Sequence, residues 1–251
     1  MTPPRPEKVA IFATCMADFA APGPVLAAVE VLEAMGMEVE VPPRQSCCGQ
    51  PALNSGYPAA AKPVIDQTLA AFEGYDAIVS PVGSCVAMLV KHAKDATEIT
   101  EAKQRVLDRM WEFTQFVTTY GADLDLVLDA TVTYHDSCHM SRFLGERTSP
   151  RVLLSRIKGV TLIEMTDSDT CCGFGGTFSV KFPELSVAMA DVKLGYELES
   201  GADYVVGSDP GCLLHQQARA IATGVPLKFR HIAELTRDAL HNARRLAGAS
   251  S

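Results

Sequence analysis

Eight cysteines carry the chemistry that this sequence can do. They fall into two sets of four, and each set contains an adjacent pair followed by glycine. The first set is Cys15, Cys47, Cys48 and Cys85, and the second is Cys138, Cys171, Cys172 and Cys212. Cysteines of this kind bind soft metals, take part in redox chemistry, or are buried as small hydrophobic side chains.

The spacing of the cysteines favours a multi-iron site. Burial alone imposes no spacing, so it does not explain two sets that match each other. Structural zinc sites usually contain Cys-x₂₋₄-Cys pairs, and neither half of the chain has one. Adjacent cysteines suit an iron–sulfur core, because neighbouring side chains can reach different irons. We therefore expect iron–sulfur ligation, with a non-catalytic zinc-bound scaffold as the alternative.

The two cysteine sets lie in a repeated sequence. The aromatic-proline pair Tyr57-Pro58 recurs as Phe182-Pro183, and the segment from Gly74 to Val79 recurs from Gly201 to Val206, each time at the corresponding place between cysteines. A repeat of this kind determines the architecture, because each copy should fold in the same way.

Strand-like and helix-like segments alternate in each half, which indicates parallel βαβ units. We predict an α/β fold of two pseudo-twofold-related lobes with parallel sheets, the halves being residues 1–125 and 126–251. The expected strands are 9–13, 37–41, 74–79, 132–135, 160–164 and 201–206. The expected helices include segments starting at 24, 58, 149, 183 and 210, and the stretches 101–120 and 232–246.

Every cysteine of the two sets follows a predicted strand, where open parallel sheets bind their ligands. Cys85 and Cys212 each open a helix, and a helix N-terminus should lower the pKa of their thiols. Gly49 and Gly173 follow the adjacent pairs and allow the backbone to approach an inorganic core, with their amides donating to cluster sulfides.

Two histidines lie close enough in sequence to the cysteines to act with them. His139 is adjacent to Cys138, and His215 follows Cys212 by about one helical turn, so that it faces the same site. We take His139 and His215 as candidate catalytic residues that relay protons. His135 lies inside a predicted strand, and we expect a structural role for it.

The composition excludes several classes of protein. The net charge is −8 and the pI about 5.3, which argues against a nucleic-acid partner. No stretch reaches the roughly 20 apolar residues of a membrane span. The first residues run into a strand-like segment without the apolar core of a signal peptide. We therefore expect a cytoplasmic protein.

The cysteine pattern resembles that of the cysteine-rich CCG-domain family. Its members include the CCG-type subunit of heterodisulfide reductase, the iron–sulfur subunit of glycolate oxidase and lactate-utilization protein A. The family pattern is a cysteine, a long gap, Cys-Cys-Gly, a second long gap and Cys-x-x-Cys, present twice. The resemblance covers essentially the whole chain. Gly83-Ser84-Cys85 and Asp136-Ser137-Cys138-His139 are most similar to the lactate-utilization protein A group.

The resemblance implies an iron–sulfur oxidoreductase subunit in the oxidation of L-lactate, a small 2-hydroxy acid, to pyruvate. It implies two partners, a ferredoxin-like iron–sulfur protein and a third lactate-utilization subunit. A thiol/heterodisulfide reductase or a glycolate oxidase-type iron–sulfur subunit is the alternative. The first cysteine of Cys-x-x-Cys is replaced by Val82 and Asp209. Four cysteines per half can still ligate a 4Fe-4S cluster, while the cluster geometry and any disulfide chemistry stay open.

Overall fold

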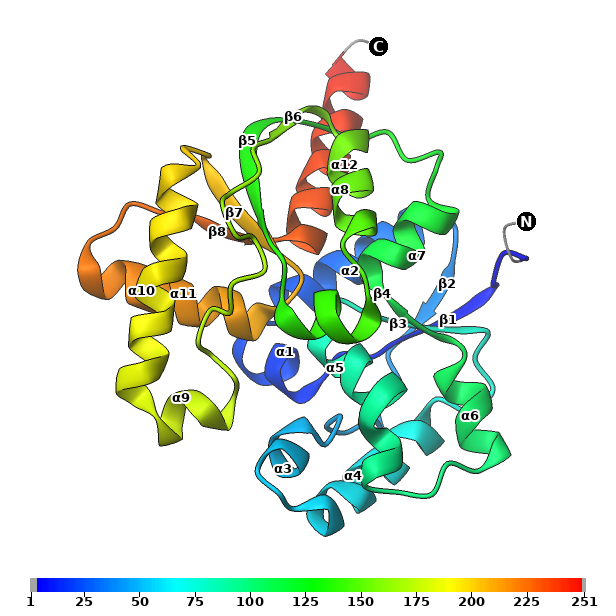
Figure 1. Cartoon of the computed structure of the whole chain (residues 1–251). Helices are drawn as coiled ribbons and strands as arrows, with labels where there is room; N and C mark the ends of the chain where they lie inside the picture. The colour runs from blue at the N-terminus through cyan, green and yellow to red at the C-terminus, as the bar shows by residue number, and fades with distance from the viewer. Residues whose placement is uncertain (1–3, 250–251) are drawn as a thin grey trace. The chain divides into compact units, whose positions relative to one another are not determined.

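The computed structural model describes residues 4–249 and divides the chain into two compact units, one ending at Asp123 and the other beginning at Leu124 (Figure 1). Each unit contains one four-stranded sheet in which all paired strands run parallel. The predicted α/β fold with parallel sheets and an internal repeat is therefore confirmed. The assignment of domains 1–125 and 126–251 stays a prediction, and residues 1–3 and 250–251 lie outside the described part.

The first unit is built around strands in the order β2-β1-β3-β4. These strands are β1 (Lys8–Ile11), β2 (Glu38–Glu40), β3 (Ala77–Ser80) and β4 (Met110–Glu112). The helices are α1 (Cys15–Ala20), α2 (Gly23–Ala34), α3 (Gln50–Asn54), α4 (Pro58–Ala71), α5 (Gly83–Ala87), the π-helix η1 (Met88–His92), the 3₁₀-helix η2 (Ala93–Asp95), α6 (Glu101–Leu107) and α7 (Phe113–Tyr120). In Figure 1, α2 and α7 lie on one side of the sheet, and α4 and α5 on the other.

The second unit repeats this order as β6-β5-β7-β8. Its strands are β5 (Val127–His135), β6 (Lys158–Leu162), β7 (Tyr204–Gly207) and β8 (Phe229–His231). Its helices are the π-helix η3 (Met140–Leu144), α8 (Thr148–Arg156), α9 (Thr177–Lys181), α10 (Pro183–Glu199), α11 (Pro210–Thr223) and α12 (Ile232–Ala249). Helices α8 and α12 lie on one side of the sheet, and α10 and α11 on the other (Figure 1).

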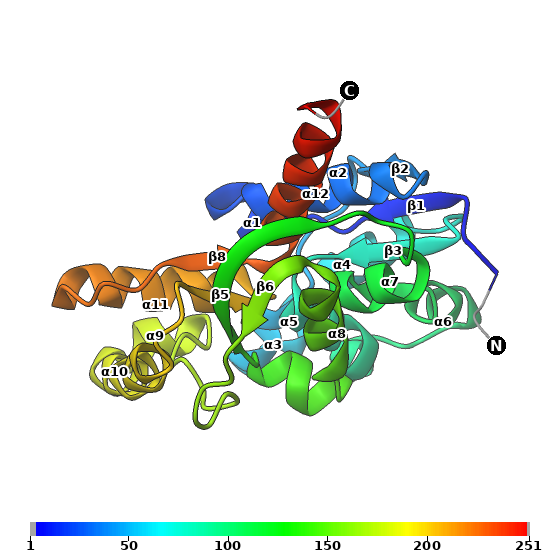
Figure 2. The same ribbon diagram turned by 90° about the horizontal axis from the view of Figure 1, so that it is seen from above.

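The central strands are buried because helices cover both faces of each sheet. Val9, Ala10 and Ile11 of β1 have no exposed surface, and the apolar run of β3 is equally buried. Continuous apolar strands of this kind are typical of parallel sheets. The longest strand, β5, bends along its length (Figure 2), and its pairing with β6 shifts register between Val127 and Ala130.

The stretch 101–120, predicted as one helix, is two helices separated by a strand. Met110 pairs with Ile78 of β3, and Glu112 then caps α7 by accepting hydrogen bonds from the amides of Thr114 and Gln115. The apolar spacing of the stretch fits a helix, but a buried carboxylate that caps a new N-terminus ends one element and starts another. Strand β8, the counterpart of β4, was also not predicted, because three residues are too few to show a period.

The last helix, α12, is the longest, with 18 residues. It buries one apolar face, which includes Ile232, Leu235 and Ala239, and carries charged residues on its other side. Within residues 4–249, none of the helices combines the length and the apolar character needed to cross a membrane.

Candidate metal centres

The four cysteines of the first unit come together at the carboxyl edge of its sheet. Cys15 begins α1 after β1, Cys47 and Cys48 lie in the loop after β2, and Cys85 lies in the first turn of α5 after β3. The Sγ atoms of Cys15 and Cys47 are 3.4 Å apart, and those of Cys48 and Cys85 are 3.3 Å apart. The structure therefore brings together all four predicted ligands of this unit.

The second unit places its four cysteines in the same way. Cys138 begins the helical turn that continues as η3, Cys171 and Cys172 follow β6, and Cys212 lies in the first turn of α11. The thiols form a continuous series of contacts from Cys138 through the adjacent pair to Cys212. The second set is thus also assembled at one edge of the sheet.

The surroundings of one cysteine in each unit favour its thiolate form. The thiol of Cys15 donates a hydrogen bond to the sulfur of Cys47, the thiol of Cys48 interacts with that sulfur, and the amide of Gly49 donates to it at 3.4 Å. These donors lower the pKa of Cys47 to about 3. The corresponding donors of the second unit lower the pKa of Cys171 to about 2. Because the thiolate is the form that binds metal, this lowered pKa prepares one cysteine of each unit for metal binding.

The prediction that the helix N-terminus lowers the pKa of Cys212 was wrong. Cys172 donates a hydrogen bond to its sulfur, but burial and the nearby negative charges of Asp209 and Cys171 outweigh that effect and raise the pKa. The position of Cys212 at the start of α11 therefore does not leave its thiol with a lowered pKa.

Hydrogen bonds fix the loop that carries the adjacent pair of the first unit. The side-chain oxygen of Gln45 accepts a hydrogen bond from the amide of Ala13, at 2.8 Å, which ties the loop to the end of β1. Thr68 of α4 accepts from the amide of Ser46 and donates to the carbonyl of Cys47, both at 3.1 Å. The loop is thus held from a strand and from a helix.

In the second unit, charged groups hold the corresponding loop. The carboxylate of Asp136, only 2% exposed, accepts two hydrogen bonds of 2.9 Å from Arg151 and one of 2.7 Å from Ser168. The buried ammonium of Lys193 donates to the carbonyl of Ser168 at 2.8 Å. Paired, charge-assisted bonds of this kind orient a loop firmly. No sequence pattern indicated this network.

The two candidate catalytic histidines both lie beside the second set of cysteines. Nδ1 of His139 is 3.5 Å from Sγ of Cys138. Nε2 of His215 is 3.2 Å from Oγ of Ser186, whose hydroxyl donates to the carbonyl of Gly173. Because the single hydroxyl proton is used in that bond, Nε2 of His215 donates to Ser186. Burial lowers the pKa of His215, so its ring is neutral at pH 7. A catalytic role for either histidine stays a prediction.

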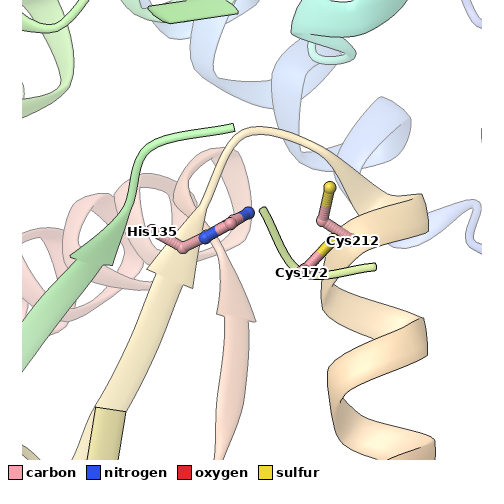
Figure 3. A group of neighbouring side chains, drawn as sticks. All are labelled: His135, Cys172 and Cys212. Atoms are coloured by element: carbon pink, nitrogen blue, oxygen red, sulfur yellow. The ribbon is translucent and has the colours of Figure 1, made fainter. Parts of the chain in front are cut away.

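His135, for which we expected only a structural role, lies beside the second cysteine set. Its ring projects from the end of β5 towards Cys172 and Cys212 (Figure 3), and the possible ligand atoms of the three residues lie within 4.8 Å of one another. The side chain is 1% exposed, and neither ring nitrogen has a hydrogen-bond partner within residues 4–249. Burial lowers its pKa to about 3, which leaves the neutral ring that binds metals.

The interior around His135 is more polar than the corresponding interior of the first unit. We call Thr133, His135, Lys193, Glu197 and Gln216 the buried polar set; each is at most 1% exposed. At the corresponding places of the repeat, the first unit has Ala10, Phe12, Thr68, Phe72 and Leu89. The two units therefore share a fold and a cysteine pattern but differ in the chemistry of their cores.

Comparison with known proteins identifies the family. The sequence-family model of the CCG cysteine-rich domain matches the chain twice, over residues 9–90 and 132–216, once in each unit. The chain belongs to the CCG cysteine-rich domain family. Each match includes one complete set of four cysteines, so the two copies of the family domain coincide with the two copies of the repeat in the structure.

Relatives and a solved structure agree with this assignment. Lactate utilization protein A of Bacillus thuringiensis (strain Al Hakam) and that of Bacillus cereus (strain AH187) are each 43% identical to this CCG-domain chain over 233 residues, 91% of the chain and 98% of the relative. The crystal structure of a hypothetical protein from Helicobacter pylori superposes with a TM-score of 0.61 over 94% of the chain, at 12% identity. The chain spans 49% of that protein, and the likeness shows a shared fold.

Replacement of Gly173 by alanine should disrupt the loop of the second unit. Its φ is +84°, and a β-carbon there would collide with the backbone carbonyl of Ser186. Gly201, with φ +67° and nothing within 4 Å, is the matched control. We expect Gly201→Ala to cost about 1 kcal/mol of unfolding free energy, from the positive φ alone, and Gly173→Ala about 3 kcal/mol, because overpacking adds to the strain. Urea denaturation measures both; equal losses would contradict the close approach.

Glu197 should make the stability of the protein depend on pH. Both carboxylate oxygens are buried without a partner in the described residues, and burial raises its pKa from the ordinary 4.5 to about 8 although Lys193 opposes this. Its contribution is therefore complete below pH 4.5 and is lost as the pH rises through 8, with a slope of up to about 1.4 kcal/mol per pH unit.

Glu197→Gln should remove that slope, whereas Glu199→Gln, an exposed carboxylate on the same helix, should leave it unchanged. The unfolding free energy of each variant is measured by urea denaturation between pH 5 and 9. An unaltered slope in Glu197→Gln would show that this carboxylate is ionised in the folded protein.

Proposed function

We propose that this chain is an iron–sulfur oxidoreductase subunit that carries electrons in the oxidation of L-lactate to pyruvate. The observation that carries the proposal is the convergence of four thiols at the carboxyl edge of each of two parallel sheets. The lactate part is supported by the relatives named Lactate utilization protein A, which match the chain over nearly their whole length. The coarser conclusion, a redox-associated role in lactate utilization, rests on the same similarity.

The residues fit iron–sulfur clusters in both units. The proposed ligands are the four cysteines of each set, and two features of the site support them. Sulfur is the donor that iron–sulfur clusters require, and the pKa of one thiol per unit is lowered. Gly49 and Gly173, with φ of +83° and +84°, let the backbone pass close to a bulky core. When bound, 4Fe-4S clusters would supply one-electron redox chemistry.

The protein's own residues would hold charge and move protons. Oxidation of lactate to pyruvate releases two electrons and two protons, so proton acceptors are needed near the site. The neutral ring of His215, oriented by Ser186, can take up a proton, and His139 lies against the thiol of Cys138. We assign both histidines this relay role. The amides of Gly49 and Gly173 donate to sulfur and would stabilise the reduced, more negative state.

The proposal includes partners. A subunit that carries electrons needs a protein that delivers or accepts them, and we propose a ferredoxin-like iron–sulfur protein and a third lactate-utilization subunit for these roles. The substrate would be a small 2-hydroxy acid, and the compartment the cytoplasm, where thiols stay reduced.

One observation favours a second candidate, a thiol–disulfide or heterodisulfide reductase. In the first unit the Sγ atoms of Cys15 and Cys47, and of Cys48 and Cys85, are in contact at 3.4 and 3.3 Å. A disulfide needs a bond of about 2.05 Å, so small movements would allow two disulfides to form. Without iron, the same cysteines are arranged for dithiol chemistry.

Anaerobic purification followed by addition of substrate tests the proposal. We expect a brown protein with several irons and matching acid-labile sulfide per chain, and bleaching of its visible spectrum by L-lactate when the two partner proteins are present. Glycolate is added in a parallel sample, to separate lactate oxidation from a glycolate oxidase-type activity.

Three outcomes would contradict the proposal. A colourless protein with stoichiometric zinc and no sulfide would indicate a zinc scaffold. A spectrum that changes only with thiols or disulfides would indicate the reductase. Bleaching by glycolate but not by L-lactate would show that the substrate assignment is wrong, while the cluster assignment would stand.

A further inference from the structure

We propose that His135 is a nitrogen ligand of the cluster in the second unit, where it binds one iron in place of a thiolate, so that the two clusters of the chain have different donor sets. The inference rests on the proposed iron–sulfur function. It adds a residue to the metal site that the cysteine pattern does not include, and it makes the two copies of the repeat chemically different.

The position of the ring is the first observation. His135 is the last residue of β5, and β5 lies next to β7 at the centre of the sheet, where His135 pairs with Gly207. From there the ring points towards Cys172 and Cys212 (Figure 3), with one ring nitrogen within 4.8 Å of the sulfurs of both residues. A metal bound by these thiolates would be within reach of the imidazole.

The unsatisfied nitrogens are the second observation. A buried polar atom without a hydrogen bond costs about 1–3 kcal/mol, and most buried polar groups in proteins have a partner. Both nitrogens of His135 lack one within the described residues. Other members of the buried polar set also have unpaired atoms, but only His135 offers them next to two thiols. Coordination of iron would satisfy one nitrogen directly.

The repeat supplies the third observation. Phe12, the counterpart of His135, directly follows β1 and lies three residues before Cys15, as His135 lies three residues before Cys138. Phe12 is fully buried and packs edge-on against Phe72, with ring centroids 5.4 Å apart. The position therefore needs only an apolar ring for packing. A histidine at this place in the second unit is not required by the fold, which points to a role in the metal site.

A histidine ligand has a predictable chemical effect. Imidazole is a neutral donor, whereas thiolate is an anion that stabilises the oxidised iron. When imidazole binds an iron in place of one of the four thiolates, it therefore raises the reduction potential of the cluster. The cluster of the second unit should accept an electron before that of the first unit. During stepwise reduction, the nitrogen-bound cluster should be the first to show a paramagnetic signal.

Pulsed electron paramagnetic resonance of the anaerobically purified full chain tests the ligand directly. We expect a strong nitrogen coupling in the first cluster to be reduced, and its change to the ¹⁵N pattern when the protein is labelled with ¹⁵N-histidine. This measurement needs no mutation, so it does not depend on the folding of a variant. A brown protein without nitrogen coupling would overturn the inference while leaving the proposed function intact; a colourless protein would overturn the proposed function.

Three variants separate a ligand from a structural residue. His135→Phe installs the side chain of the first unit and should abolish the nitrogen coupling. His135→Cys should keep the cluster, lose the coupling and lower the reduction potential. His139→Gln, which changes the other histidine beside Cys138, should retain the coupling. Coupling that persists in His135→Phe, or is lost in His139→Gln alone, would show that His135 is not the ligand.

Discussion

The structure depends on the parallel order of four strands, in which the first strand lies between the second and the third. This order brings the ends of three strands together, so the loops after β1, β2 and β3 can each present cysteines to one small region, as those after β5, β6 and β7 do. The number of residues between two cysteines then has little influence on whether their side chains meet. Cysteines far apart in sequence meet because hydrogen bonding between the strands fixes where each loop begins.

The two units show what this framework requires and what it leaves free. Both keep the four cysteines, the glycine after the adjacent pair and a helix side chain that binds the preceding loop, Thr68 in one unit and Lys193 in the other. Their interiors differ, because Phe12 and Phe72 of the first copy correspond to His135 and Glu197 of the second copy. The fold therefore needs the loop geometry, whereas the polarity behind the cysteines varies between the two copies.

Much of this organisation could be predicted from the sequence. The cysteine spacing and the paired flanking motifs predicted the repeat, the parallel sheets and the place of all eight thiols, because these features follow from local patterns that recur. Strands β4 and β8 could not be predicted, since three-residue strands are formed by pairing with a neighbour and carry no period of their own. His135 was assigned a structural role because its distance to Cys172 and Cys212 arises only on folding. Comparison with Phe12 in the other copy was the signal that could have singled it out.

The central claim is that each unit binds its own cluster through cysteines of its own set. The most direct measurement is the iron and acid-labile sulfide content of the anaerobically purified chain and of two double variants, Cys47→Ser/Cys48→Ser and Cys171→Ser/Cys172→Ser, with circular dichroism to verify folding. We predict that each double variant stays folded and loses about half of the iron and half of the sulfide. Each variant removes two thiolates that one cluster needs and leaves the cysteines of the other unit unchanged. Folded variants that keep all of their iron would contradict this claim.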